Sequence, residues 1–329
     1  MISREIGWSN QNNLTFGIIK QVNKIQKDVC CNCNISTTTT TSTTLLLRNF
    51  DVTAQWGLAT PAVTSPATFK TFLESGQDGD GNTNDLTGVV ITDFLLVGDR
   101  LRCNVSSTGG TNLGFAYMGV TDVTSFGNLQ MTNYLSLYSN NISSVDNTSW
   151  PIGVGDIDLG NNSITSFDNV TWPSSLNDYL GLYDNAIISF NPVTPLPNTI
   201  TELDLSNTFI TSVDNVVWPS DLQYLYLNTN QIVNFDPIVA LPSGLIYIVL
   251  QDNQIVTFNP TLPLPSGLQQ LSLDINQMTT AGYTSSEPWA NAMSVIPGRG
   301  NVYIFSNINS ASGTNLETIL IAKGWTVSS

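Results

Sequence analysis

The sequence predicts a solenoid in which short parallel β-strands stack into one sheet over residues 113–283. A pattern of the form Leu-x-Leu-x-x-Asn-x-Ile recurs there, and its Asn position falls at residues 140, 162, 185, 208, 230, 253 and 276. These positions are 22 or 23 residues apart, and proline recurs in the second half of most units. Such even spacing predicts nearly identical coils with one strand in each.

The pattern inside each unit explains why the coils must stack. Alternate leucines of a strand, such as Leu135 and Leu137, point to one side, and a single strand cannot bury them. Asparagine donates and accepts hydrogen bonds at once, so we expect the recurring Asn to satisfy backbone groups of neighbouring coils. Thr208 replaces it in one unit. We expect the contact between neighbouring coils at this position to be weaker or bridged by water.

The second half of each unit carries its own motif. Trp-Pro or Leu-Pro steps begin the segments 172–176, 218–222, 241–245 and 264–268. Because proline cannot continue a helix, we expect this side to be extended or polyproline-like. The Leu-Pro-x-x-Leu step resembles bacterial-type leucine-rich repeats, over about half of the chain. The resemblance implies a leucine-rich-repeat solenoid with a parallel β-sheet on its concave face and an extended, non-helical convex side.

Both ends of the solenoid need covering, because terminal coils expose apolar core. Residues 45–112 predict a small α/β cap, with a helix at 66–75 that follows Ser65 and alternating apolar residues at 88–97. Residues 284–329 predict a second cap, with a short helix near 287–293, a strand at 302–304 and a helix near 315–323. The closing segment contains Trp325.

Residues 1–36 predict a helical segment for oligomerisation and anchoring. The apolar residues of its helix, 9–29, recur three or four apart at Leu14, Ile18, Val22, Ile25 and Val29. This spacing fits a short coiled coil, which we expect to form a homotrimer; an amphipathic helix packed on its own domain is the alternative. Residues 37–44 form a Thr-rich linker.

The first residues also carry a resemblance. The run Arg4-Glu-Ile-Gly-Trp-Ser-Asn-Gln-Asn-Asn-Leu14, followed by the Ile/Val-spaced helix, resembles the N-terminus of virion proteins of tailed phages that infect Bacteroidota. It covers about the first 28 residues. The resemblance implies a head or tail fibre or spike on the virion surface, made in the host cytoplasm, that contacts other virion proteins through this segment.

Charge excludes several classes of partner. The chain has 10 Lys and Arg against 25 Asp and Glu, a formal charge of −15. It would repel nucleic-acid phosphates and anionic lipid headgroups. It also shows no apolar run of membrane-spanning length and no secretory leader. We therefore expect neither nucleic-acid binding nor membrane insertion.

Catalytic motifs are scarce. The chain contains no His, which removes Ser-His-Asp and Cys-His machinery and histidine metal sites. A glycosidase would need two facing carboxylates. The available pairs, Asp156 with Asp158 and Glu202 with Asp204, lie two apart on a strand and point to the same side, towards solvent. We expect no enzyme and no cofactor, with an acidic glycan hydrolase as the alternative.

Two motifs could hold a metal ion. Asp78, Asp80 and Asn82 resemble the first half of an EF-hand calcium loop, but Val89 stands where the bidentate Glu belongs. A metal-free polar loop is favoured, with calcium as the alternative. Cys30, Cys31 and Cys33 could bind zinc or cross-link chains at a threefold axis; free thiols in a reducing cytosol are favoured.

The outward strand positions are the most informative surface. Tyrosines alternate with carboxylates there, and these residues suit glycan or protein recognition, although tyrosine is also simply a good strand residue. The candidate ligand-binding residues of the concave face are Tyr134, Tyr138, Tyr179, Tyr183, Tyr224, Tyr226, Tyr247, Asp158 and Asp204. The predicted function is adhesion of a non-enzymatic phage surface protein to a host-surface or environmental glycan or protein. A purely structural virion decoration protein is the alternative.

Overall fold

The structure is a computed structural model that describes residues 48–51, 65–74, 89–97, 100–107, 112–116, 120–121, 123, 133–151, 153–165 and 169–329. The predicted coiled-coil positions Leu14, Ile18, Val22, Ile25 and Val29 lie outside these residues. So do Cys30, Cys31 and Cys33, and the calcium-loop candidates Asp78, Asp80 and Asn82.

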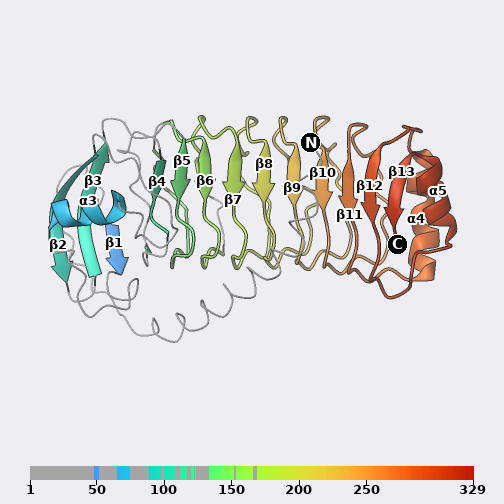
Figure 1. Ribbon diagram of the computed structural model, residues 1–329, viewed down its shortest axis with the longest axis horizontal. Coiled ribbons are helices and arrows are strands. Elements are labelled where there is room, and N and C mark those ends of the chain that lie inside the picture. Colours follow the sequence, from blue (N-terminus) through green and yellow to red (C-terminus); the bar gives the residue numbers. More distant parts are fainter. Residues whose placement is uncertain are drawn as a thin grey trace.

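One long sheet dominates the described residues (Figure 1). Its ten strands follow one another in chain order, and each pairs in parallel with the next. The strands are β4 (Asn112–Gly114), β5 (Tyr134–Ser136), β6 (Asp156–Asp158), β7 (Tyr179–Gly181), β8 (Glu202–Asp204), β9 (Tyr224–Tyr226), β10 (Tyr247–Val249), β11 (Gln270–Ser272), β12 (Gly300–Tyr303) and β13 (Trp325–Ser328). This confirms the leucine-rich-repeat solenoid.

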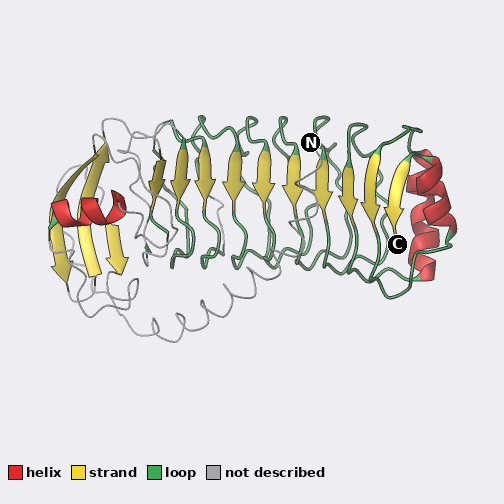
Figure 2. Ribbon diagram, in the orientation of Figure 1, coloured by secondary structure: helices red, strands yellow, loops and turns green. Residues whose placement is uncertain are grey.

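The segments that join the strands confirm the extended, non-helical side. Among the described residues between β5 and β11, turns and extended backbone make every connection, and no helix occurs (Figure 2). Recurrent prolines account for this, because proline removes a backbone donor and clashes with a helical turn.

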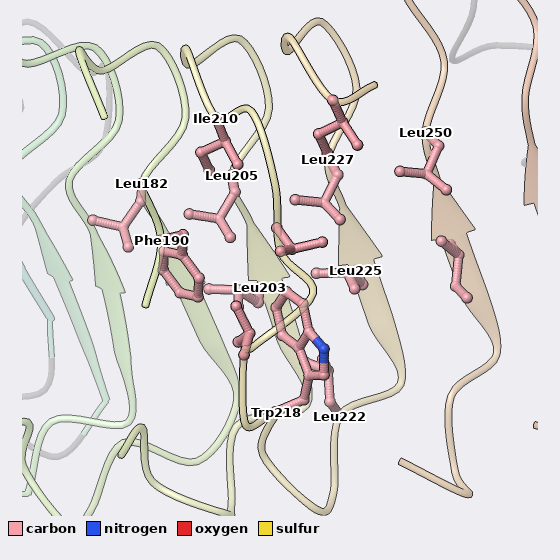
Figure 3. Close-up of a cluster of buried hydrophobic side chains, with 14 of the residues drawn as sticks. Leu182, Phe190, Leu203, Leu205, Ile210, Trp218, Leu222, Leu225, Leu227 and Leu250 are labelled. Carbon is pink, nitrogen blue, oxygen red and sulfur yellow. The ribbon is translucent and has the colours of Figure 1, made fainter. Parts of the chain in front are cut away.

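The core lies between the sheet and these extended segments. Leucines of successive strands, such as Leu203 and Leu225, meet Phe190 and Trp218 from the opposite side (Figure 3). All four side chains are buried, and the same core continues from Phe115 to Trp325. Burying each leucine contributes about 1.5–3 kcal/mol, so the stacked coils stabilise one another.

An asparagine ladder links the coils. In Asn185 the Nδ2 atom donates to the carbonyl of Leu159 in the preceding coil at 2.9 Å, and Oδ1 accepts from the Ile164 N–H at 2.9 Å. The same two inter-coil bonds recur at Asn140, Asn162, Asn230, Asn253, Asn276 and Asn307. The predicted role of this residue is confirmed.

Thr208 interrupts the ladder as expected. Its hydroxyl donates to the Leu205 carbonyl at 3.1 Å and to Oδ1 of Asn230 at 2.5 Å. It does not reach back to the Leu182 carbonyl or the Ile187 N–H, the groups that an asparagine would bind by analogy with its neighbours. This rung therefore lacks both side-chain bonds to the preceding coil.

The residue before each ladder position has a left-handed backbone, with φ between 51° and 57°. This conformation turns the chain sharply after the strand and directs the next side chain inward. The positions are Ser139, Asn161, Asp184, Asn207, Thr229, Asp252, Ile275 and Ser306. Asn and Asp tolerate this conformation, whereas β-branched Thr229 and Ile275 are strained in it.

The C-terminal segment extends the sheet and then covers its end. α5 (Asn315–Ala322) confirms the predicted second helix, and β12 confirms the predicted strand. β13 was not predicted as a strand. α4 (Thr280–Ala292) and α5 lie beyond β13 in Figure 1.

The predicted start of the first C-terminal helix, near residue 287, was wrong. α4 begins seven residues earlier at Thr280, after the N-cap Thr279, whose hydroxyl accepts from the Gly282 N–H at 3.2 Å. Burial of Tyr283 and Trp289 against the core stabilises this helix, although it contains Pro288.

At the other end of the row lies a small antiparallel sheet (Figure 1). Its strands β1 (Arg48–Asp51), β3 (Arg100–Ser107) and β2 (Val89–Val97) are adjacent in that order. α3 (Pro66–Glu74) accompanies them, and Oγ of Ser65 accepts from the Thr68 N–H at 3.3 Å. The helix predicted at 66–75 is confirmed.

Candidate functional site on the outer sheet face

The outward side chains of the sheet form three columns, because the parallel strands are in register. We call this surface the sheet face. Its first column contains Tyr134, Asp156, Tyr179, Glu202, Tyr224, Tyr247 and Gln270. The second contains Ser136, Asp158, Gly181, Asp204, Tyr226, Val249 and Ser272, and the third Tyr138, Gly160, Tyr183, Ser206, Asn228, Gln251 and Asp274. All nine predicted binding residues lie here; their role in binding stays a prediction.

Asp158 lies at the centre of the most elaborate part of this face. Its Oδ1 atom accepts from the Gly160 N–H at 2.8 Å. Its Oδ2 atom accepts from the hydroxyls of Tyr134 and Tyr183, each at 3.4 Å. Only 8% of the residue is exposed. Burial raises the pKa of Asp158 to about 6, while these hydrogen bonds favour the charged form.

Two glycines leave the space that the surrounding tyrosine rings occupy. A Cβ atom on Gly160 would lie 2.3 Å from Cζ of Tyr183, so that ring lies directly over Gly160. There it stacks on Tyr138, with ring centroids 5.9 Å apart and planes 28° apart. A Cβ atom on Gly181 would lie 2.4 Å from the hydroxyl oxygen of Tyr179.

Gly181 stands between Asp158 and Asp204 in the second column. The Tyr179 hydroxyl therefore lies between these two carboxylates. Burial and the charges of Asp158 and Asp204 raise the pKa of Tyr179 well above its ordinary value, so the phenol stays neutral. We call Asp158 with Tyr134, Tyr138, Tyr179 and Tyr183 the tyrosine cluster.

Acidic side chains flank this cluster. Asp204 accepts from the Ser206 N–H at 2.9 Å, and burial raises its pKa to about 6. Burial also raises the pKa of Asp156 and of Glu202. Together with Asp158 of the cluster, these three carboxylates sit on β6 and β8, on either side of Tyr179.

The sheet face changes character from β9 onwards. Tyr224 and Tyr247 meet edge to face, with ring centroids 5.2 Å apart. Tyr226 lies beside Asp204 in the second column and is followed there by Val249. Strands β9 to β11 themselves carry no charged residue.

Counter-charge is missing from most of the solenoid. Residues 103–298 contain 15 Asp and Glu but no Lys, Arg or His. The next cation is Arg299, which is buried in the C-terminal segment, where it lies over the Trp325 ring and donates to the Pro265 carbonyl at 3.2 Å. The sequence prediction used the total charge and overlooked this distribution. It also overlooked Gly160 and Gly181, whose signal is their place at outward strand positions beside tyrosines.

The arrangement of side chains on the sheet face does not favour glycan hydrolysis or metal binding. The Tyr179 hydroxyl stands between Asp158 and Asp204, where a hydrolase would need room for a sugar ring or a water molecule. Within the part of the chain that the structure describes, no three acidic or cysteine side chains converge as a metal ion requires. None of the described helices is long and apolar enough to cross a membrane.

No protein-family profile and no curated protein matches this sequence. Among solved structures, the chain is similar to YopM from Yersinia enterocolitica WA-314, with a TM-score of 0.42 and 18% identity over 61% of this chain and 38% of that one. It is also similar to the crystal structure of PEPR1–AtPEP1, with a TM-score of 0.32 and 17% identity over 60% and 32%. The chain thus spans less than two fifths of either neighbour. Its strand register and asparagine ladder make it a leucine-rich-repeat solenoid.

Proposed function

We propose that this protein is a non-enzymatic adhesion protein that binds a host-surface or environmental glycan or protein with its sheet face. The observation that carries the proposal is the set of tyrosines held in register on consecutive strands. Their rings offer flat apolar surfaces with hydrogen-bonding rims. Packing over Gly160 and Gly181 orders Tyr183 and Tyr179 before a ligand arrives, which lowers the entropy lost on binding.

We also propose that the protein is displayed on a phage virion, as a head or tail fibre or spike. The N-terminal run from Arg4 to Leu14 supports this through its resemblance to phage virion proteins. In this proposal residues 1–36 form a homotrimeric stalk that contacts other virion proteins and leaves the solenoid free to bind.

Adhesion is tested with the full-length, fluorescently labelled protein on a panel of Bacteroidota cells. We expect surface labelling of at least one strain. Sensitivity to periodate would identify a glycan ligand, and sensitivity to protease a protein. The variant with Tyr179→Ala, Tyr183→Ala and Tyr224→Ala should label those cells at least about tenfold more weakly.

The matched control carries Val193→Ala, Val217→Ala and Ile238→Ala, which alter exposed side chains near prolines rather than on the sheet face. It should label cells like the unaltered protein. Equal loss in both variants, or failure of the unaltered protein to label any strain, would contradict adhesion through the sheet face.

The virion location is tested separately. Antibodies against the chain should decorate heads or tails of purified particles, and deletion of residues 1–36 should abolish incorporation. The purified protein should sediment as three chains of 35.6 kDa. Washed particles that lack the protein would overturn the virion proposal. Particles that carry it without labelling any cell would favour the decoration role instead.

A further inference from the structure

Asp158 is a buried carboxylate that meets no cation among the residues that the structure describes. It is 8% exposed, and its hydrogen-bond donors are one backbone N–H and two tyrosine hydroxyls. The charged neighbour that acts on it is another acid, Asp204. A buried charge that lacks an opposite charge is costly, and a cation brought by a ligand would relieve that cost.

The rings around Asp158 suit a cation. Tyr134, Tyr138, Tyr179 and Tyr183 are all half-buried, so each presents part of its surface to solvent. The electron-rich face of a tyrosine ring attracts ammonium and guanidinium groups, and several such rings together bind cations in aromatic cages. Here the rings surround a carboxylate, which adds a full negative charge to the same site.

Acidic side chains around the tyrosine cluster extend its preference for cations beyond Asp158. The carboxylates of β6 and β8 are two strands apart. From the usual spacing between neighbouring strands, this separation is roughly 10 Å. A polypeptide in the polyproline II conformation has three residues per turn and advances about 3.1 Å per residue, so every third side chain lies on the same side at about this separation. Asp274, which follows β11, adds one more acidic side chain beyond the uncharged strands β9 to β11.

We propose that the tyrosine cluster binds a lysine or arginine side chain of a partner polypeptide, whose polyproline II segment crosses the strands with basic residues about three apart. This inference rests on the proposed adhesive role of the sheet face and names the kind of partner that this face takes. Charge complementarity selects the partner, because residues 103–298 of this chain provide no cation of their own.

The test uses the full-length protein and a fluorescent peptide of four Lys-Thr-Ser repeats, with Gln-Thr-Ser repeats as the neutral control. Fluorescence anisotropy should show binding of the Lys peptide, weakened by added salt. It should show at least about tenfold weaker binding of the Gln peptide. An Arg-Thr-Ser peptide decides between ammonium and guanidinium, and either result supports the proposal if the Gln peptide stays weak.

Three variants locate the site. Asp158→Asn removes the central charge, and Gly160→Ala displaces the Tyr183 ring while every charge remains. Each should weaken Lys-peptide binding at least about tenfold. The control Asp221→Asn with Asp252→Asn removes two exposed charges away from the cluster and should change binding less than about threefold. Circular dichroism melting shows which variants remain folded.

Gly160→Ala separates a built site from general attraction to an acidic surface. Normal peptide binding by a folded Gly160→Ala protein would overturn the proposal, as would equal weakening by the control pair. Failure of the peptide to bind at low salt would also overturn it. If the peptide does not bind but the protein still labels cells, the adhesive role remains supported. If the protein labels no cells but still binds the peptide, the basic-peptide site remains supported.

Discussion

The inner side of the strands repeats the same residues from coil to coil, whereas the outer side varies. Inside, nearly every coil repeats the same leucines and the same asparagine, whose inter-coil bonds recur from Asn140 to Asn307. Outside, each strand differs from the next, and Tyr134, Asp156 and Tyr179 succeed one another in one column. Repetition therefore marks what holds the solenoid together, whereas variation marks where a ligand can be recognised. Substitutions on the two sides should separate stability from binding.

The largest expected effect is on the inside. Asn253→Ala removes the bond to the Leu227 carbonyl and the bond from the Ile232 N–H. The Ile232 N–H is then buried without a partner, and the Leu227 carbonyl keeps only its bond from Asn230. We therefore expect the free energy of unfolding to fall by about 3 kcal/mol. Urea denaturation measures this. Asn228→Ala, which alters the outer side of the preceding coil, should change it by less than about 0.5 kcal/mol. Equal effects would contradict the division between the two sides.

The next effect is on the outside and depends on pH. Burial raises the pKa of Asp158 from 3.8 to about 6 in the folded chain. The folded state therefore holds its proton more tightly, and the contribution of Asp158 to stability is full below pH 3.8 and is lost as pH rises to about 6. Asp158→Asn should raise the free energy of unfolding at pH 7.5 by about 2 kcal/mol and leave it nearly unchanged at pH 3.5.

Denaturation at the two pH values checks this prediction. Asp221→Asn, an exposed control, should change stability by less than about 0.5 kcal/mol at either pH. A loss of stability in Asp158→Asn at pH 7.5 would show that the buried charge is compensated by groups other than those described.

A smaller gain is expected where the ladder is interrupted. Thr208→Asn supplies a side chain that can reach the Leu182 carbonyl and the Ile187 N–H. Two added inter-coil bonds should raise the free energy of unfolding by about 1.5 kcal/mol. Chemical denaturation measures the change, and Thr208→Val, which cannot form these bonds, should not reproduce the gain. A less stable Thr208→Asn protein would mean that the rung has no space for the amide.

The smallest effect concerns the turns. Ile275 adopts a φ of 54°, which a β-branched side chain tolerates poorly and asparagine tolerates well. Ile275→Asn should therefore raise the unfolding free energy by about 1 kcal/mol. Its control is Asn207→Ile, which places the strain in another coil and should lower stability by a similar amount. Thermal melts in which Ile275→Asn lowers stability, or Asn207→Ile raises it, would contradict this explanation of the turns.

Sequence periodicity predicted the parts of the fold that repeat. The Asn spacing located the strands from β5 to β11, and the prolines predicted the extended side. Features that depend on one local contact were not predicted. The early start of α4 depends on the Thr279 cap and on burial of Tyr283. The left-handed turns carry varied residues such as Ser139 and Ile275, so no single residue type signals them.

The sequence placed every candidate tyrosine on one face but could not show how the rings lie. Strand alternation decides which side a residue occupies, whereas the direction of a ring depends on the space beside it. That space comes from Gly160 and Gly181, which look unremarkable in a repeat pattern. The gathering of rings around Asp158 is therefore a product of neighbouring coils, which periodicity alone does not reveal.

Binding by the sheet face should be separable from the stability of the solenoid. Cell binding and the urea midpoint, measured on the same variant, test this separation. The variant carries Tyr179→Ala, Tyr183→Ala and Tyr224→Ala. We predict binding at least about tenfold weaker with the protein still folded at the binding temperature. Undiminished binding by the folded variant would show that the ligand does not bind through these tyrosines.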